Sequence, residues 1–393
     1  MNSKERMARA MRHDMPDRVP LMCQLALGHY FLNTPLKPHA IWFTSEGFAE
    51  ALVTLQRRYR FDGILINLPG RDPDWRASVA DIAETPRGEA ITWASGGQTL
   101  LPWDDNAQHF PANPARSRPS FEDFDPDRDF ERVDSWPMYT WGVYHTPELA
   151  GKAPGLLREP PSYFTRTLDL VKAAVGDEVS IHGEVFSPFT HLMELFTYED
   201  ALAHLALEPD KAAAILDQLT EASIAWGVAQ ARWGVDAVLI SSAYAGGGFI
   251  SPRMYRRFVL PYEARLVDAV HSAVPGVPVY THTCGRISDR LELIMETGTD
   301  GIDTLDPPPI GDTVLADAKA RIGGRLFIKG NLNGVAMLQA DGVEPVLEMA
   351  RERLRDGMPG GGYILSTACS VPPRVQPEKL EALYPLVEAE GRY

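Results

Sequence analysis

Eight short apolar runs most constrain how this chain of 393 residues can fold, because helical segments separate the later ones. Several runs have polar ends around an apolar middle, which is typical of a parallel strand buried on both faces. The runs are residues 19–24, 63–68, 179–185, 237–241, 277–282, 301–305, 326–330 and 363–367. Segments with a helical period are 210–226, 253–273, 288–297, 313–322 and 343–356. This alternation predicts one α/β domain over residues 1–393, a (β/α)8 TIM barrel.

One long interruption, residues 69–161, follows the second run. It is rich in Pro, Asp, Arg and Trp and loses the alternation, although residues 90–95 and 99–101 flank Gly96-Gly97 and predict a hairpin. An insertion at this point lies over the barrel mouth, so we interpret it as a lid that shapes a substrate pocket. Its tryptophans either contact substrate or form a small core of the insertion. They are Trp75, Trp93, Trp103, Trp136 and Trp141.

Two of the three cysteines and one histidine are placed where a metal ion could collect them. His282 and Cys284 flank one residue at the end of the fifth run, so strand alternation points both side chains to one face. Cys369 follows the eighth run and meets them if both strands belong to one closed sheet. Two thiolates and an imidazole favour zinc, and three protein ligands leave a catalytic fourth position open. The alternative is that the cysteines are buried small hydrophobic residues.

Composition restricts the partners and the compartment of the protein. A formal charge of −15 argues against nucleic acid or an anionic membrane as a partner, since both need a basic surface. The first residues lack the apolar core of a signal peptide, and no apolar stretch is long enough to span a bilayer. Three widely spaced cysteines do not form a disulfide framework. We therefore expect a soluble protein of the reducing cytoplasm.

Several segments resemble the uroporphyrinogen decarboxylase superfamily from end to end, apart from the insertion. They are residues 5–11, 16–20, 251–262, 282–285, 329–333 and 372–373. The resemblance implies the TIM-barrel fold. It does not imply the decarboxylase activity, because residues 25–30 contain no arginine where those enzymes hold substrate carboxylates, and Asn67 stands where they have a central aspartate.

The corrinoid-linked zinc methyltransferases of the same superfamily are the better match. They carry zinc on His-x-Cys and a distant Cys, which correspond here to His282, Cys284 and Cys369, whereas a decarboxylase usually has a histidine at the last position. The resemblance implies two cofactors, zinc and a corrinoid such as cobalamin. The chain has no Asp-x-His-x-x-Gly corrinoid motif, so the corrinoid is expected on a partner protein or as a transient ligand at the barrel mouth.

Carboxylates at the ends of predicted strands are further candidate residues of the functional site. Asp306, just past the sixth run, is either a fourth zinc ligand or a turn cap before the following prolines. Glu184, at the end of the third run, is a candidate acid/base group or a support for the metal ligands. Its neighbour His182 is expected to be a satisfied core histidine.

Polar residues elsewhere on the predicted rim are candidates for contact with substrate. Asn67 and Asn331 end strands and could orient substrate oxygens, with Asn67 in a catalytic position. Tyr244, a candidate catalytic residue, precedes three glycines on a loop that could close over the site. His29 and Tyr30 lie after the first run, where the family binds substrate.

The sequence favours a zinc-dependent methyltransferase that moves a methyl group between a small O- or S-methyl compound and a corrinoid. The tryptophan-rich insertion favours an aryl methyl ether as that compound, hence O-demethylation. Two alternatives remain: a lyase of the uroporphyrinogen decarboxylase type, and a non-catalytic protein that binds and presents a corrinoid or a thiol.

Overall fold

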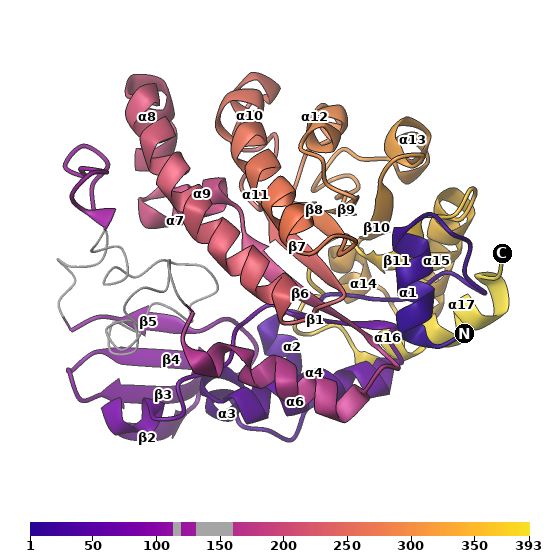
Figure 1. Ribbon diagram of the computed structural model, residues 1–393. Helices are drawn as coiled ribbons and strands as arrows, with labels where there is room; N and C mark the ends of the chain where they lie inside the picture. The colour runs from indigo at the N-terminus through magenta and orange to yellow at the C-terminus, as the bar shows by residue number, and fades with distance from the viewer. Residues whose placement is uncertain (113–118, 131–159) are drawn as a thin grey trace.

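A computed structural model describes residues 1–112, 119–130 and 160–393, and its centre is a curled sheet of seven parallel strands (Figure 1). The strands follow the order β1-β6-β7-β8-β9-β10-β11. Their bounds are β1 Gly63–Ile66, β6 Ser180–Phe186, β7 Ala237–Ser241, β8 Val279–Thr283, β9 Gly301–Thr304, β10 Phe327–Leu332 and β11 Tyr363–Thr367. All seven correspond to predicted runs, and the TIM-barrel-like α/β fold is confirmed.

The first predicted run, residues 19–24, takes the place of the eighth strand without forming one. Leu21 makes a single parallel bridge to Leu365 of β11. On the side of β1, the Leu21 N–H donates to the Asp62 carboxylate at 2.8 Å. This side chain takes the place of the backbone carbonyl that a neighbouring strand would offer. Pro20 has no N–H to donate. The prediction of a regular strand is therefore wrong here, although the segment still occupies the gap between β11 and β1.

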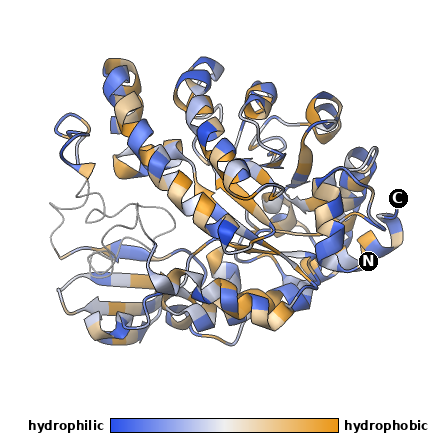
Figure 2. Cartoon of the chain, in the orientation of Figure 1, coloured by the Kyte–Doolittle hydropathy of each residue, from blue (hydrophilic) through white to orange (hydrophobic). Residues whose placement is uncertain are grey.

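Helices surround the sheet, with polar and apolar positions alternating along them (Figure 2). They are α1 Ser3–Met11, α2 Leu27–Asn33, α3 Pro38–Phe43, α4 Ser45–Tyr59, α6 Arg166–Val175, α7 Pro188–Leu195, α8 Tyr198–Leu207, α9 Pro209–Arg232, α10 Pro252–Phe258, α11 Leu260–Ala273, α12 Leu291–Glu296, α13 Leu315–Ile322, α14 Gly334–Gln339, α15 Glu344–Gly357, α16 Pro377–Glu381 and α17 Leu383–Glu390. The helix predicted over 253–273 breaks at Val259, two residues before Pro261, whose ring disfavours a continuous helix. Within the described ranges, no helix is long and apolar enough to cross a membrane.

Helix α1 fills the amino-terminal end of the barrel. Met7, Ala10 and Met11 are buried in one cluster with side chains from the first half of the barrel strands, such as Leu239 and Tyr280. Packing at this end leaves the carboxyl ends of the strands as the open rim, where side chains can meet a ligand.

The interruption after β1 forms a second, antiparallel sheet of four strands beside the barrel (Figure 1). Its strands are β2 Val79–Thr85, β3 Gly88–Trp93, β4 Gln98–Pro102 and β5 Gln108–Phe110. The predicted hairpin is confirmed as the β3–β4 pair. Trp75 and Trp93 are buried against Phe43 of α3, with ring centroids 4.8 and 5.5 Å away, so these two belong to a core; Trp103 is half-buried. Trp136 and Trp141 lie outside the described residues.

Candidate metal centre and adjoining cavities

Three side chains from two strand ends converge at the open rim. His282 is the fourth residue of β8, Cys284 follows that strand directly, and Cys369 lies two residues beyond β11. The ligand atoms of all three lie within 4.8 Å of one another. The Nε2 atom of His282 is 3.2 Å from the Cys284 sulfur, and the two sulfurs are 3.9 Å apart. The curled sheet therefore brings together the three residues that the sequence singled out.

A carboxylate behind His282 fixes the imidazole. Asp303 of β9 lies beside His282 in the sheet register, and its Oδ2 is 3.2 Å from Nδ1. Thr304 Oγ1 also lies 2.8 Å from Nδ1. Lys329 of β10 is the register partner of Asp303 and donates to its Oδ1 at 3.1 Å. With Nδ1 held in this way, Nε2 faces the thiols, as it does in carboxylate–histidine–metal arrangements.

Asp303 and Lys329 were not among the residues expected from the sequence. Both belong to predicted strands, but their approach to His282 depends on the register between β8, β9 and β10. The sequence did contain a signal for this pair, namely two charged residues inside apolar runs, because Asp and Lys are rarely buried without a partner.

The local charges favour a thiolate at Cys369. The hydrogen bond between Cys284 and Cys369, together with the nearby His282, lowers the pKa of Cys369 well below its usual range despite burial. The same hydrogen bond, together with burial, raises the pKa of Cys284 well above its usual range. Burial lowers the pKa of His282, but hydrogen bonds with Asp303 and Cys369 raise it overall to about 10. A thiolate is the form in which cysteine binds a metal.

Asp306 and Glu184 lie at the same end of the barrel. Asp306 Oδ2 accepts the Gly285 N–H at 2.7 Å, which ties the loop after β9 to the loop after β8. It is not part of the compact three-residue group, and its role as fourth ligand stays a prediction.

Glu184 of β6 is 3% exposed, and burial raises its pKa to about 7, although His282 and Ser241 act in the opposite direction. Neither Glu184 oxygen makes a well-formed hydrogen bond within the described part of the chain.

His182 and His29 are both satisfied inside the protein. The ring nitrogens of His182 lie 2.9 Å from Tyr280 Oη and 3.1 Å from Ser180 Oγ, which fits the expected core histidine. Those of His29 lie 2.7 Å from Tyr59 Oη and 3.0 Å from the Pro373 carbonyl. His29 does not line either of the cavities described below, so its assignment to substrate binding finds no contact there.

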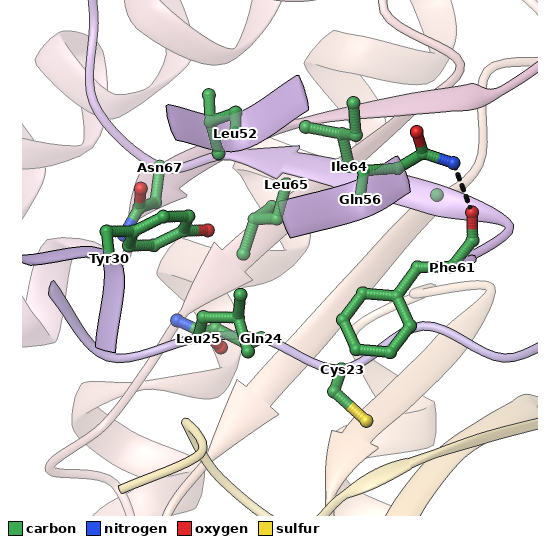
Figure 3. A pocket seen from close by; sticks show the side chains of 11 residues that line it. Cys23, Gln24, Leu25, Tyr30, Leu52, Gln56, Phe61, Ile64, Leu65 and Asn67 are labelled. Atoms are coloured by element: carbon green, nitrogen blue, oxygen red, sulfur yellow. Dashed lines mark hydrogen bonds between the residues drawn. The ribbon is translucent and has the colours of Figure 1, made fainter. Parts of the chain in front are cut away.

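Tyr30 and Asn67 line two adjoining small cavities of about 20 Å³ each. Figure 3 shows these two side chains close together, Tyr30 from α2 and Asn67 from the segment after β1. One cavity also reaches Ser370, the neighbour of Cys369. On β10, Asn331 donates to the Leu305 carbonyl at 2.7 Å, while its Oδ1 has no partner among the described residues.

Tyr244 and the following glycines form a tight loop. The Tyr244 hydroxyl donates to the Glu194 carboxylate and lies 2.8 Å from Tyr198 Oη. A Cβ at Gly246 would lie 2.2 Å from the carbonyl oxygen of Cys284. Glycine at this position therefore lets the loop pack directly against the backbone of a candidate ligand.

Comparison with known proteins agrees with this architecture. The profile of the family described as Uroporphyrinogen decarboxylase (URO-D) matches residues 152–389, and the chain belongs to this family. It is 26% identical to a uroporphyrinogen decarboxylase from Rhodospirillum rubrum over 60% of this chain and 67% of that protein. It is 27% identical to the methylcobamide:CoM methyltransferase MtaA from Methanosarcina barkeri over 55% and 60% of the two chains. These matches span about two thirds or less of each relative.

A solved structure shares the fold over the whole chain. The methyltransferase from Methanosarcina mazei superposes with a TM-score of 0.70 at 17% identity and covers 99% of both chains. An identity this low shows the fold alone.

Proposed function

We propose that this protein is a zinc-dependent methyltransferase that moves a methyl group between a small O- or S-methyl compound and a corrinoid. The observation that carries the proposal is the compact group of His282, Cys284 and Cys369 at the open rim of the barrel. Similarity to MtaA, whose name describes a methylcobamide:CoM methyltransferase, supports the same assignment. We further propose that the corrinoid arrives on a separate protein.

The donor set fits zinc. One imidazole nitrogen and two sulfurs are ligands that zinc prefers, and three such ligands leave a position for substrate. The lowered pKa of Cys369 favours the thiolate form that binds a metal. The contact between His282 Nδ1 and Asp303 leaves His282 Nε2 as the nitrogen that can bind it. Bound zinc would lower the pKa of a substrate thiol or accept a departing alkoxide. Asp306 remains our candidate for a fourth ligand when substrate is absent.

The surrounding residues would position the substrate and move its proton. When the bond between oxygen and methyl carbon breaks, the oxygen takes up a proton, and Glu184, with a pKa of about 7, is our candidate donor. Asn67, Tyr30 and Asn331 would orient the substrate. We assign the described part of the inserted residues 69–161 to the wall of the pocket, because Asn106 between β4 and β5 lines one of its cavities.

A decarboxylase-type lyase is the second candidate, and its support is the similarity to uroporphyrinogen decarboxylases. Its weakness is the first segment of the barrel, where residues 25–30 offer no arginine for substrate carboxylates. Activity on uroporphyrinogen by a zinc-free preparation would favour this candidate over ours.

The test is the zinc content of the purified protein, measured by elemental analysis without chelators. We expect about one zinc per chain, lost in Cys369→Ala because that site would keep only two ligands. Cys23→Ala is the matched control: the third cysteine is buried but is not part of the compact group, so its loss should leave the zinc content unchanged. The next step is methyl transfer from aryl methyl ethers to cob(I)alamin. Zinc absent from both wild type and Cys23→Ala would refute the proposal.

A further inference from the structure

Two successive residues at the end of β9 have a left-handed backbone. Thr304 and Leu305 are both fully buried, and their φ angles are 85° and 55°. Positive φ is uncommon outside glycine, and a β-branched residue such as threonine rarely adopts it. Backbones of this kind persist only where the surrounding structure holds them, and they gather at functional sites. This turn lies beside the candidate metal centre, because Thr304 is the register partner of Thr283, the last residue of β8.

The turn brings two successive side chains to one ring nitrogen of a candidate metal ligand. Asp303 Oδ2 lies 3.2 Å from His282 Nδ1, and Thr304 Oγ1 lies 2.8 Å from the same atom. In a regular strand, successive side chains point to opposite faces, so Asp303 and Thr304 would not reach the same side. The left-handed backbone at Thr304 accounts for the exception, since it turns the hydroxyl back toward His282.

The neighbouring strand β10 holds this turn in place. The Asn331 amide donates to the Leu305 carbonyl at 2.7 Å, and Asn331 is itself fully buried. Gly330 is the register partner of Thr304, and a Cβ at Gly330 would lie 2.8 Å from the Thr304 carbonyl oxygen. Glycine therefore leaves room for the irregular backbone, and the next residue along the strand fixes it by a hydrogen bond.

We propose that Thr304 is a positioning residue of the metal centre and that Asn331 acts through it by holding the turn. The inference rests on the proposed function, because it assigns a role at the same centre. When Nε2 of a neutral histidine binds a metal, the ring proton sits on Nδ1. In His282 this N–H then has two acceptors, the Asp303 carboxylate and the Thr304 hydroxyl. A single acceptor leaves the ring free to tilt about one contact, whereas two acceptors keep Nε2 directed at the Cys284 sulfur, 3.2 Å away.

Two substitutions at Thr304 separate the hydroxyl from the backbone. Thr304→Val keeps the branched shape, and with it the cost of a positive φ, but removes the hydroxyl, whereas Thr304→Ser keeps the hydroxyl. In the purified full-length protein, competition with a chromophoric chelator should show zinc affinity about tenfold lower in Thr304→Val, as for loss of other groups that orient metal-binding histidines. The affinity of Thr304→Ser should stay close to that of the wild type. Thr220→Val is the matched control, because it removes a buried hydroxyl of α9 that donates to the Leu216 carbonyl.

A double-mutant cycle tests the part of Asn331. Asn331→Leu removes the amide that bonds to Leu305 at nearly the same side-chain volume, and it should also lower zinc affinity. If Asn331 acts through Thr304, the double variant with Thr304→Val should bind zinc no more weakly than the weaker single variant. Additive losses would show that Asn331 acts independently and would overturn its assignment.

Nitrogen-15 NMR of the His282 ring gives a readout that needs no zinc. In the zinc-free protein, the Nδ1 signal should move in Thr304→Val and stay near its wild-type position in Thr304→Ser. An unmoved Nδ1 signal in Thr304→Val would overturn the inference, and so would a loss of zinc affinity in Thr304→Ser as large as in Thr304→Val. If the Nδ1 signal responds as expected but the wild type binds no zinc, the contact that positions His282 is confirmed and the proposed function fails. The same division holds if zinc affinity responds as expected but the zinc-loaded protein transfers no methyl group.

Discussion

Replacing Asp303 with Asn should weaken zinc binding and destabilise the fold, for two separable reasons. The carboxylate holds His282 Nδ1 at 3.2 Å and pairs with Lys329 at 3.1 Å, and Asp303 and Lys329 are each only 2% exposed. Loss of a carboxylate that orients a metal-binding histidine typically weakens metal affinity by about 10- to 100-fold, or about 1.4–2.8 kcal/mol. Leaving Lys329 buried without its partner should lower the free energy of unfolding by about 3–5 kcal/mol.

The double variant Asp303→Asn, Lys329→Met separates these two effects. Removing both charges should restore much of the stability, because no unpaired ammonium group remains buried. Zinc affinity should stay low, because His282 still lacks its carboxylate. Urea unfolding measures stability, and competition with a chromophoric chelator measures zinc affinity. Recovery of zinc affinity together with stability would refute the positioning role of Asp303 and leave it a purely structural residue.

Three other substitutions test neighbouring parts of the argument. Gly246→Ala should push the loop away from the Cys284 carbonyl and speed zinc loss to a chelator; an unchanged loss rate would contradict the close packing. Glu184→Gln should keep zinc but lower the methyl-transfer rate by about 100-fold or more if Glu184 moves the proton, and a wild-type rate would exclude that role. Burial raises the pKa of Glu263 to about 7, so the folded state binds its proton more tightly and stability should fall as pH rises from about 4.5 to about 7. The shift corresponds to at most about 3 kcal/mol, and urea unfolding of Glu263→Gln across this range should show a smaller fall than the wild type.

The order of strands and helices could be predicted from the sequence because each strand or helix has its own period of apolar residues. Seven of eight apolar runs became strands, and the described strands that follow β1 in the chain, β2 to β5, form a sheet of their own. The first run differed because Asp62, outside the strand, accepts the Leu21 N–H with its side chain. The helix predicted over 253–273 breaks at Val259, two residues before Pro261.

By itself, the sequence determined that His282 and Cys284 share one face of a strand, since side chains two residues apart point the same way. It also marked Cys369 at the end of another strand. Only the tertiary structure decided that Asp303 and Lys329 stand at the same level as His282, because neighbours on different strands depend on the register between them. The tertiary structure also decided that His29 is hydrogen-bonded to Tyr59 and to the Pro373 carbonyl rather than facing the cavities. Periodicity is a property of one segment, whereas register and side-chain direction result from packing several segments into one curled sheet.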